Sequence, residues 1–177
     1  MNLLILDLDE TLIHATRVWE RADYSFIVGP YLVYIRPHVE RFLKSMAEHY
    51  EIAVWTSSSD EYASKVISEL PFSKNPGFIW TRDRCTPAYD HEKRERFYIK
   101  DLKKLRRLGY DLDRVLVVDD SAGSASRNYG NLVRVKPYGG EPEDRELILL
   151  ERYLISIAGR TDLRSFEKRV WRKQVTE

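Results

Sequence analysis

Residues 3–12 read Leu-Leu-Ile-Leu-Asp-Leu-Asp-Glu-Thr-Leu, and the predicted sheet is built around this stretch. Its first four residues form an apolar run typical of a strand buried in a parallel sheet. The run ends at Asp7, and Asp9 and Thr11 come next at alternate positions. Because alternate residues of an extended chain share one face, Asp7 and Asp9 can converge on one point. Two such carboxylates repel each other unless a cation or a proton joins them, so the stretch predicts a divalent metal with room for a phosphate. The alternative is that these are ordinary turn and helix-cap residues.

Composition limits the class of protein. The chain has 177 residues, enough for one domain with its own core, and a net charge of +1 gives no global field for binding nucleic acid or an anionic membrane. A single cysteine, Cys85, excludes an intrachain disulfide framework and a thiolate zinc cluster and fits a reducing compartment. No apolar run is long enough to span a membrane, and Asp7 and Asp9 interrupt any secretory signal. We expect a soluble, cytoplasmic protein with no membrane partner.

Short apolar strands alternate with amphipathic helices along the chain. Strands are expected at 3–6, 51–56, 77–81, 114–118 and 131–135, and helices at 38–50, 60–70, 100–108 and 143–158, with a short helix beginning near Ala122. This alternation predicts an α/β fold, a three-layer doubly wound parallel sheet.

Two segments are expected to decorate this sheet, and no large cap domain is expected. Residues 13–37 form a flap, in which 13–21 is a loop and 24–28 and 31–36 form a hairpin around Gly29-Pro30. Residues 82–98 lack a helical stripe and form a small surface insertion. Residues 143–177 hold C-terminal helices, the last of which carries Leu163, Phe166 and Val170 at helical spacing. Residues 1–177 are interpreted as a single domain.

Polar side chains follow three of the expected strands where each ends: Asp7, Thr56-Ser57 and Asp119-Asp120. In open parallel sheets, ligands bind at the carboxyl ends of the strands. These residues are therefore candidates for one common site.

Together with Lys100, these positions resemble the four motifs of the haloacid dehalogenase superfamily. Within it, the chain resembles the small phosphatases that act on the C-terminal domain of RNA polymerase II, over roughly residues 3 to 155. The matching blocks are Asp-Leu-Asp-Glu-Thr-Leu-Ile-His at 7–14, Arg-Pro-His at 36–38, Trp-Thr-Ser-Ser at 55–58, Tyr-Ile-Lys-Asp-Leu at 98–102 and Val-Val-Asp-Asp-Ser at 117–121.

The resemblance implies roles in phosphoryl transfer. Asp7 would be the nucleophile and Asp9 the general acid and then the base. Mg²⁺ would be held by the Asp7 carboxylate, the backbone carbonyl of Asp9 and the Asp120 carboxylate. Asp119 would pair with Lys100. The roles of Asp119 and Asp120 could also be exchanged. Substrate contacts would come from Thr11, Thr56, Ser57, Tyr62, Arg82 and Lys100, of which Thr56 and Lys100 would also assist catalysis.

Each of these residues has a plainer alternative. Thr56 precedes a helix whose positive end can bind phosphate, but it could equally be a helix cap. Lys100, expected in the first turn of a helix, opposes the helix dipole and so calls for an anion, unless it is simply solvated. Asp119 and Asp120 could cap the helix expected near Ala122. The small phosphatases usually have Asn at position 120 and Pro at 122, which puts substrate identity in question rather than activity.

The short flap and insertion leave an open site, which suits a phosphorylated side chain on a protein. Aromatic residues could line a peptide groove or pack the flap against the core: Trp19, Tyr24, Phe26, Tyr31 and Tyr89. We expect a Mg²⁺-dependent phosphatase for phosphoserine or phosphothreonine in a protein or peptide partner. The alternatives are a phosphatase for small molecules or nucleic-acid ends, and a non-catalytic binding module.

Basic clusters at 103–107 and 168–173 are interpreted as solvated helix faces, so nucleic acid is not an expected partner. The sequence does not determine the oligomeric state.

Overall fold

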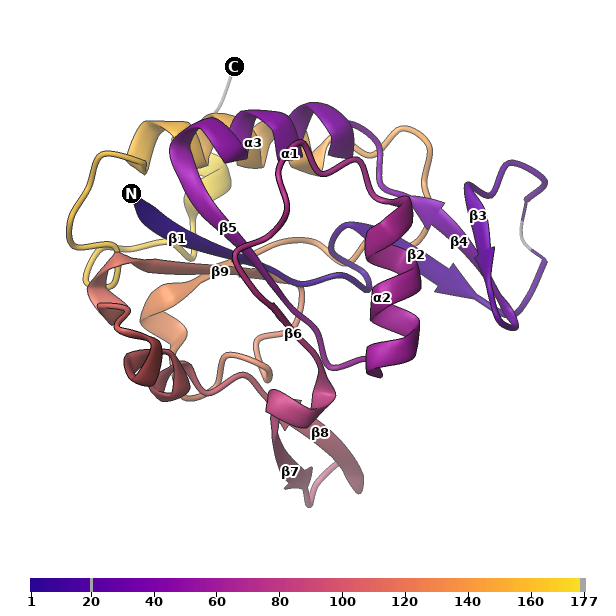
Figure 1. Cartoon of the computed structure of the whole chain (residues 1–177), viewed down its shortest axis with the longest axis horizontal. Helices are drawn as coiled ribbons and strands as arrows, with labels where there is room; N and C mark the ends of the chain where they lie inside the picture. Colours follow the sequence, from indigo (N-terminus) through magenta and orange to yellow (C-terminus); the bar gives the residue numbers. More distant parts are fainter. Residues whose placement is uncertain (20, 176–177) are drawn as a thin grey trace.

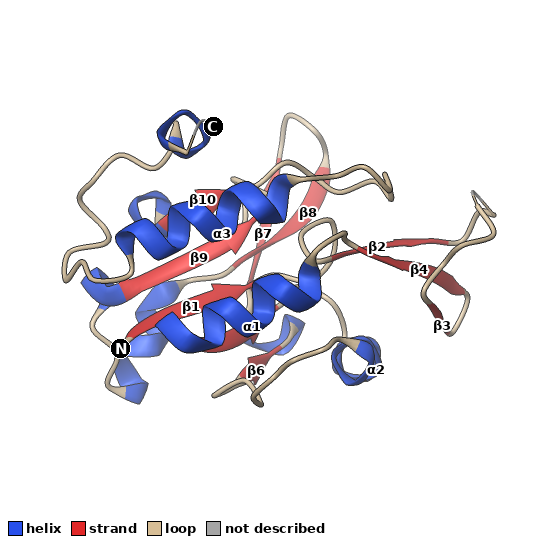
Figure 2. Ribbon diagram, turned by 90° about the horizontal axis from the view of Figure 1, so that it is seen from above, coloured by secondary structure: helices blue, strands red, loops and turns tan. Residues whose placement is uncertain are grey.

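A five-stranded parallel sheet lies at the centre of the protein (Figures 1 and 2), in a computed structural model that describes residues 1–19 and 21–175. In spatial order the strands are β10 (Leu132–Arg134), β9 (Val115–Asp119), β1 (Asn2–Leu6), β5 (Tyr50–Trp55) and β6 (Ile79–Trp80). All four neighbouring pairs are parallel. The predicted α/β fold is confirmed.

Strand β1 occupies the middle of the sheet and is buried along its whole length. From β1 the chain adds β5 and then β6 on one side, and later β9 and then β10 on the other side. The order therefore reverses at β1, and ligands bind at such a switch point, beyond the carboxyl ends of the strands. Asp7 is the first residue past β1, and its amide still donates to the Val118 carbonyl at 3.0 Å.

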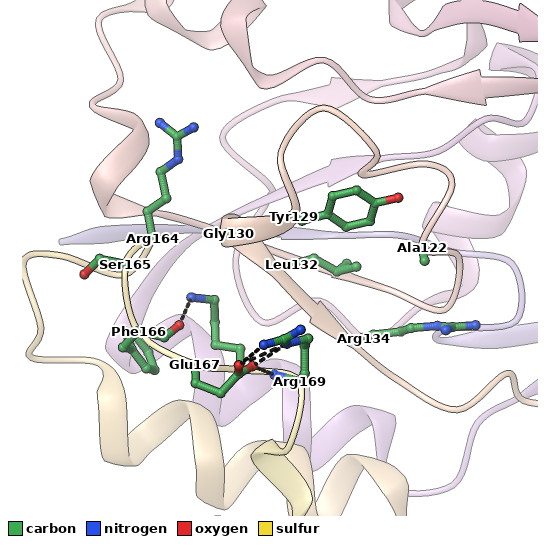
Figure 3. Close-up of a pocket in the computed structure, with 11 residues that line it drawn as sticks. Ala122, Tyr129, Gly130, Leu132, Arg134, Arg164, Ser165, Phe166, Glu167 and Arg169 are labelled. Atoms are coloured by element: carbon green, nitrogen blue, oxygen red, sulfur yellow. Dashed lines mark hydrogen bonds and ion pairs between the residues drawn. The ribbon is translucent and has the colours of Figure 1, made fainter.

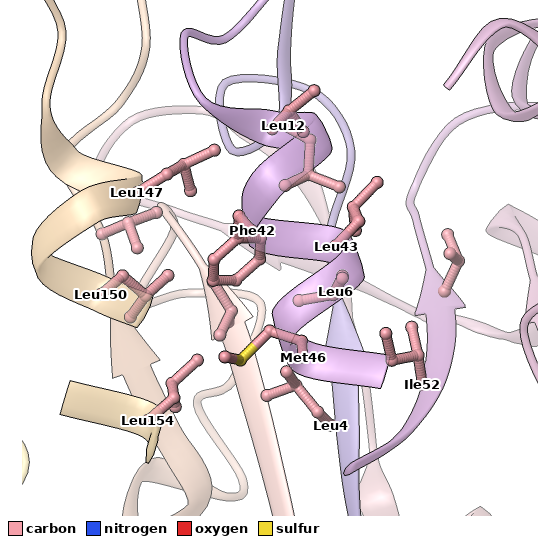
Figure 4. Close-up of a cluster of buried hydrophobic side chains, with 14 of the residues drawn as sticks. Leu4, Leu6, Leu12, Phe42, Leu43, Met46, Ile52, Leu147, Leu150 and Leu154 are labelled. Atoms are coloured by element: carbon pink, nitrogen blue, oxygen red, sulfur yellow. The ribbon is translucent and has the colours of Figure 1, made fainter. Parts of the chain in front are cut away.

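Helices cover both faces of the sheet. On one face, α1 (Val39–His49) and α3 (Glu146–Ile157) lie side by side (Figure 2). Figure 4 shows their apolar side chains meeting those of the sheet: Phe42, Leu43, Met46, Leu147, Leu150 and Leu154 with Leu4, Leu6 and Ile52. Helix α2 (Asp60–Glu69) adds Ala63 and Val66 to this cluster. On the other face, the 3₁₀ helices η2 (Leu102–Leu108) and η3 (Leu112–Arg114) cover a smaller cluster that includes Trp55.

The flap is a three-stranded antiparallel sheet rather than a hairpin. Strands β3 (Phe26–Val28) and β4 (Tyr31–Ile35) form the expected hairpin, and β2 (Ile13–Thr16) pairs with the other side of β4. The expected loop at 13–21 is therefore wrong at 13–16. Only Ile13 of β2 is fully buried, so local alternation is weak and the strand depends on its distant partner β4. Residue 20 of the flap lies outside the described residues.

The insertion also contains strands. After the short 3₁₀ helix η1 (Arg82–Arg84), β7 (Thr86–Asp90) and β8 (Glu95–Ile99) form an antiparallel hairpin that projects from the sheet (Figure 1). Most residues of this hairpin are exposed or half-buried, so no buried stripe marks it in the sequence. A small surface insertion is present as expected, but its strand content was not predicted.

Two of the expected helical segments differ in kind. The helix expected at 100–108 is the 3₁₀ helix η2, which begins at Leu102 with Asp101 as its N-cap. The expected helix near Ala122 is absent from the described residues, where turns lead instead to the 3₁₀ helix η4 (Tyr129–Asn131). After β9 the side chains of Ser121 and Ser124 bond to nearby backbone groups, which competes with α-helix formation there.

The expected last helix, through Leu163, Phe166 and Val170, is wrong. After α3 the described chain is irregular, with only a 3₁₀ turn, η5 (Trp171–Gln174). Leu163 and Trp171 are fully buried, whereas Val170 is 44% exposed, so burial does not follow one helical face. Residues 176–177 of this expectation lie outside the described residues. Within the described chain, no helix has the length and apolar character needed to cross a membrane.

Candidate active site

Three predicted site residues from distant parts of the chain meet at the carboxyl end of the sheet. Asp7 follows β1, Asp119 ends the neighbouring β9, and Lys100 follows β8. Lys100 Nζ lies 2.6 Å from Asp7 Oδ1 and 2.6 Å from Asp119 Oδ2. The side chains of all three are buried, with no more than 9% exposure. The structure thus places one ammonium group between two carboxylates.

The expected position of Lys100 inside a helix is wrong, and so is its alternative as a solvated lysine. Asp101, the next residue, caps η2 through its side chain, so Lys100 precedes the helix. The Lys100 amide donates to the Ser124 carbonyl at 2.8 Å, which ties this segment to the loop after β9. The helix-dipole argument therefore does not apply, and the two carboxylates themselves explain why a buried ammonium is tolerated.

Burial and charge shift the pKa values of this cluster. Burial raises the pKa of Asp7 well above its usual value, although Lys100 opposes the shift. Burial alone would lower the pKa of Lys100, but Asp119 and Asp7 outweigh it and raise the pKa, so the ammonium stays charged. Burial and the nearby Asp119 raise the pKa of Asp120 to about 6. When ionised, the three carboxylates of Asp7, Asp119 and Asp120 carry more negative charge than Lys100 alone neutralises, and the raised pKa values of Asp7 and Asp120 reflect that excess together with burial.

A divalent cation fits this excess of negative charge. One carboxylate oxygen from each of Asp7, Asp119 and Asp120 lies within 4.8 Å of the others. Carboxylate oxygens are the ligands that Mg²⁺ prefers, and a cation among them would oppose the burial-driven rise in the pKa values of Asp7 and Asp120. Asp119 is already committed on both oxygens, to Lys100 at 2.6 Å and to the Ser121 amide at 2.8 Å. Asp7 Oδ1 also accepts from Lys100, but its Oδ2 accepts only a long 3.4 Å bond from Thr11, so Asp7 and Asp120 are more available than Asp119 as metal ligands.

Asp9 lies beside Asp7 in a tight turn. Ser58 Oγ donates to Asp9 Oδ2 at 2.7 Å, and the Tyr62 hydroxyl donates to Asp9 Oδ1 at 2.7 Å. Glu10, the next residue, has φ of 58°, a left-handed conformation that non-glycine residues rarely adopt. The turn and the two hydroxyl groups together fix where the Asp9 carboxylate points.

The residues predicted to bind phosphate surround this cluster. Thr56 follows β5 and is buried, and its Oγ1 accepts from the Ser58 amide at 3.1 Å. Ser59, and not Thr56, caps α2, so the capping alternative for Thr56 is wrong. Thr11 is fully buried, and its hydroxyl lies 3.4 Å from Asp7 Oδ2, which makes it a partner of Asp7 rather than an exposed substrate contact. Asp119 and Asp120 do not cap a helix near Ala122, since none forms there.

The remaining substrate-contact candidates border a hollow between the flap and α2. Asp9, Tyr31, Ser58, Tyr62 and Arg82 are among the residues that line it. Arg82 Nε donates to the Ser57 carbonyl at 2.7 Å, and its guanidinium lies over the Tyr98 ring at 5.2 Å. The Ser57 side chain is exposed, so the structure uses its backbone to position Arg82.

Of the flap aromatics, Tyr31 packs edge to face on Tyr62, at 5.7 Å between ring centroids. Trp19 stacks in the same way on Tyr24, at 5.9 Å, and is 64% exposed. Tyr89 belongs to the insertion instead and is 48% exposed. Only Tyr31 of this group lines the hollow beside Asp9.

Two residues that organise the site were not assigned a role from the sequence. Ser58 is only the last residue of the Trp-Thr-Ser-Ser block at 55–58, and nothing local indicates that it reaches Asp9. Arg36, in the Arg-Pro-His block, is fully buried and donates to the Thr11 carbonyl at 3.0 Å and to both oxygens of Asp144 at 2.8 and 2.9 Å. The Asp144 partner lies 108 residues away, which sequence spacing cannot reveal.

Comparison with known proteins identifies similar sequences. A family model described as NLI interacting factor-like phosphatase matches residues 2–164. The chain is 30% identical over 178 residues to the CTD nuclear envelope phosphatase 1 homolog of Drosophila melanogaster, covering 92% of this chain and 70% of that protein. It is 30% identical over 168 residues to CTD small phosphatase-like protein 2 of Dictyostelium discoideum, covering 91% of this chain but 28% of that longer protein.

Solved structures share the fold. Fcp1, described as an essential RNA polymerase II CTD phosphatase, has a TM-score of 0.67 at 21% identity, over 89% of this chain and 62% of that chain. A putative β-phosphoglucomutase from Thermotoga maritima has a TM-score of 0.54 at 14% identity, over 85% of this chain and 91% of that chain. At these identities the likeness concerns the fold.

Proposed function

The chain belongs to the NLI interacting factor-like phosphatase family, and on that premise we propose that it is a Mg²⁺-dependent hydrolase of phosphoserine or phosphothreonine in proteins. Its fold is that of the haloacid dehalogenase superfamily. The observation that carries the proposal is the position of Asp7, held by Lys100 and Thr11 at the tip of β1, with Asp9 two residues away. This arrangement supplies a nucleophile, a proton-transfer group and a fixed positive charge in one place.

In the proposed reaction the Asp7 carboxylate attacks phosphorus, and the bond between phosphorus and the substrate oxygen breaks. Asp9 donates a proton to the departing serine or threonine oxygen. Asp9 then takes a proton from a water molecule, whose oxygen attacks the phosphorus of the aspartyl-phosphate and restores Asp7. The hydroxyl groups of Ser58 and Tyr62 hold Asp9 in position for both steps.

The carboxylates of Asp7 and Asp120 and the backbone carbonyl of Asp9 would hold Mg²⁺. When bound, the ion would neutralise charge on the phosphoryl oxygens. Asp119 keeps Lys100 charged and beside Asp7, so the ammonium group contributes positive charge next to the nucleophile. Among the phosphate contacts, Thr56 and the amides that lead into α2 lie at the positive end of a helix.

A protein substrate is favoured by the shape of the site. The flap and the β7–β8 hairpin are both small, and the hollow beside Asp9 opens between aromatic side chains of the flap and α2. Such a surface accommodates a side-chain phosphate presented by a polypeptide, where a closed cavity would suit a metabolite. The relatives are named as CTD phosphatases, which is consistent with a phosphoprotein substrate.

The nucleophile can be tested directly. In the presence of Mg²⁺ the protein should hydrolyse p-nitrophenyl phosphate, and chelation with EDTA or the substitution Asp7→Asn should abolish this activity. Asp113→Asn is the matched control, because Asp113 is exposed at the opposite end of β9 and should retain full activity. Asp9→Asn should still release p-nitrophenol but accumulate a hydroxylamine-sensitive phosphoprotein. Unaltered turnover by Asp7→Asn would refute the mechanism.

Substrate class requires a separate comparison. Phosphoserine and phosphothreonine peptides, sugar phosphates, nucleotides and 3′-phosphorylated oligonucleotides should be compared by kcat/KM at matched concentrations. We expect the peptides to be preferred at least tenfold, on the order of the discrimination that one or two specific contacts provide. A preference for sugar phosphates or nucleic-acid ends would leave the chemistry intact and overturn the assignment of a protein substrate.

A further inference from the structure

A second hollow lies on the other side of the active site, at the β10 edge of the sheet (Figure 3). We call it the β10 groove. Its volume is about 770 Å³, and it runs between the η4–β10 segment (129–134) and the C-terminal segment 164–169. None of the residues predicted to act in catalysis lines it, so its role is separate from the chemistry of Asp7 and Asp9.

The groove is basic in a protein that is almost neutral overall. Four of the five charged residues that line it are positive: Arg134, Arg164, Lys168 and Arg169, against Glu167. Arg169 is bound to Glu167 by a bidentate contact, and Lys168 is buried against backbone carbonyls. Arg164 is exposed, and its guanidinium makes no hydrogen bond or ion pair with any residue that the structure describes. The groove therefore presents positive charge that the chain itself does not neutralise.

The groove also offers apolar contact. Tyr129 is 60% exposed at its rim, and Phe166 is half-buried in its wall beneath Lys168, whose Nζ lies 4.2 Å from the ring centroid. Figure 3 shows Tyr129 and Leu132 on the η4–β10 side and Phe166 on the opposite side. A mixture of guanidinium groups and aromatic rings is typical of surfaces that bind polypeptides.

One end of the groove adjoins the acidic cluster of the active site. Arg134 Nε donates to the Asp120 carbonyl at 2.9 Å, and Ala122, two residues beyond Asp120, lines the groove. Two residues of extended chain span at most about 7 Å, so the start of the groove at Ala122 lies within about 7 Å of Asp120 along the chain. A polypeptide with its phosphorylated residue at Asp7 would therefore reach the groove with the residues about three to five positions away.

A peptide would not bind in the groove by adding a strand to the β10 edge of the sheet. The Arg134 carbonyl, at the outer edge of β10, accepts a hydrogen bond from Trp171 Nε1 at 2.8 Å, so the C-terminal segment already covers this edge. Recognition would depend on side chains, and the exposed guanidinium groups select carboxylates or phosphates. The carboxylate of Glu167 within the groove and the net charge of +1 disfavour nucleic acid, whose affinity depends on many unopposed cations.

We propose that the β10 groove binds an acidic segment of the substrate polypeptide, three to five residues from the phosphorylated residue. This inference rests on the proposed function, because it assumes that the substrate is a phosphoprotein. It adds a sequence preference that the catalytic residues alone would not impose.

The test uses the full chain and three phosphoserine peptides. One carries Glu at positions +3 to +5, one carries Glu at −5 to −3, and one carries Gln at all of these positions. We expect one of the acidic peptides to have a kcat/KM about tenfold above the neutral peptide, mainly through KM, and the advantage to shrink between 50 and 300 mM NaCl because exposed charges are screened. Arg164→Gln should lower the ratio of acidic to neutral kcat/KM about threefold, in keeping with one exposed ion pair. Lys44→Gln, which removes one charge from exposed α1 surface, should leave the ratio unchanged.

Binding of the unphosphorylated acidic peptide, measured by fluorescence anisotropy, separates this inference from the proposed function. If no phosphopeptide is hydrolysed, the proposed function fails, and salt-sensitive binding that Arg164→Gln weakens would still support the groove. Equal kcat/KM for all three hydrolysed peptides would overturn the inference while leaving the phosphatase proposal standing. The inference would also be overturned if Arg164→Gln left the ratio of kcat/KM for the acidic and neutral peptides unaltered. Tighter binding of a single-stranded oligonucleotide than of the acidic peptide would overturn it as well.

Discussion

The hydroxyl of Tyr62 donates a 2.7 Å hydrogen bond to Oδ1 of Asp9, across a separation of 53 residues. The hydroxyl of Ser58 donates to the other oxygen of the same carboxylate, Oδ2, at 2.7 Å. The resemblance to the small phosphatases had suggested Tyr62 as a substrate contact, and the structure adds a positioning contact to the proposed proton-transfer group. The orientation of the Asp9 carboxylate, and so its position for proton transfer, thus depends on α2 and the turn that precedes it.

The first prediction concerns this contact. Tyr62→Phe removes one of the two hydrogen bonds that orient Asp9, and it should lower kcat for a phosphoserine peptide about tenfold, a part of the 10²- to 10⁴-fold that general acid catalysis contributes. A serine alkoxide needs a proton as it leaves, whereas p-nitrophenolate is stable without one. The loss with p-nitrophenyl phosphate should therefore be smaller. Steady-state kinetics with both substrates measures the difference, and equal losses would show that Tyr62 acts only in binding.

The second prediction concerns Lys100. In Lys100→Met the buried carboxylates of Asp7 and Asp119 lose their shared cation, which should destabilise the fold by about 3 to 5 kcal/mol at neutral pH. Without Lys100, which opposes the burial-driven rise, the folded-state pKa of Asp7 would lie further above its unfolded value, so the added penalty is present at high pH and shrinks as Asp7 is protonated on lowering the pH. Urea denaturation at pH 8 and pH 5 should show a smaller difference from wild type at pH 5.

The control for this variant is Lys103→Met, three positions away on exposed η2 surface, which should change stability by less than about 0.5 kcal/mol at either pH. Mg²⁺ should recover part of the stability of Lys100→Met, since it would supply positive charge to the same carboxylates. A pH-independent loss would mean that packing around the lysine stem, and not charge, explains the effect.

The third prediction concerns the metal. The pKa of Asp120 is raised to about 6 by burial and by Asp119, and a carboxylate must be deprotonated to bind Mg²⁺. Mg²⁺ should therefore raise Tm at pH 7.5, and the shift should diminish as the pH falls through about 6 and below. Asp120→Asn should bind Mg²⁺ more weakly at pH 7.5 and lose the part of this pH dependence that Asp120 contributes, while the protonation of Asp7 supplies the rest. Differential scanning fluorimetry with and without Mg²⁺ measures both, and an undiminished shift at pH 5 in wild type would exclude Asp120 as a ligand.

Much of the central sheet was predictable because its residues carry strong local signals. Residues 3–6 and 115–118 are unbroken apolar runs followed by acids, and buried parallel strands of this kind have few alternatives. The strand ends also predicted which side chains would meet, since the carboxyl ends of parallel strands share one edge of the sheet. Asp7 and Asp119 lie close together for this reason, whereas Lys100 follows β8 of the insertion hairpin and was expected at the site only from the resemblance to the phosphatase family.

The failures occurred where structure depends on distant partners. Residues 13–16 form a strand only because β4 lies beside them, and residues 86–90 only because of β8. In the C-terminal segment, the spacing of Leu163, Phe166 and Val170 matched a helix, but the Asp162 side chain bonds to the Ser165 amide and makes a turn instead. The anchor of this segment is Trp171, whose burial follows from α3 and β10 rather than from its neighbours in sequence.

The fourth prediction concerns that anchor. Trp171 is fully buried, stacks near Tyr153 at 5.6 Å between centroids, and donates to the Arg134 carbonyl. Trp171→Ala should cost about 3 to 5 kcal/mol, as expected for a buried aromatic residue cut to alanine. Trp171→Phe should cost about half as much or less, because it keeps most of the packing. The remaining cost comes from the Arg134 carbonyl, which loses this donor. Denaturation midpoints in urea measure both, and equal costs would assign the effect to the hydrogen bond instead of packing.

The fifth prediction concerns Arg36, which links the turn after β1 to the segment before α3. Its buried guanidinium binds both oxygens of Asp144 and the carbonyl of Thr11. Arg36→Met therefore leaves the Thr11 carbonyl without this donor and the Asp144 carboxylate without a positive charge, with only the Glu146 amide bound to it, and should cost about 3 to 5 kcal/mol. Because Thr11 adjoins Asp7, kcat should also fall. The double variant Arg36→Met with Asp144→Leu removes the unpaired carboxylate, and it should recover stability but not kcat, since the Thr11 carbonyl still lacks its donor. Recovery of both quantities would show that Arg36 serves the active site only by neutralising Asp144, and failure of both would show that the guanidinium itself is needed for packing.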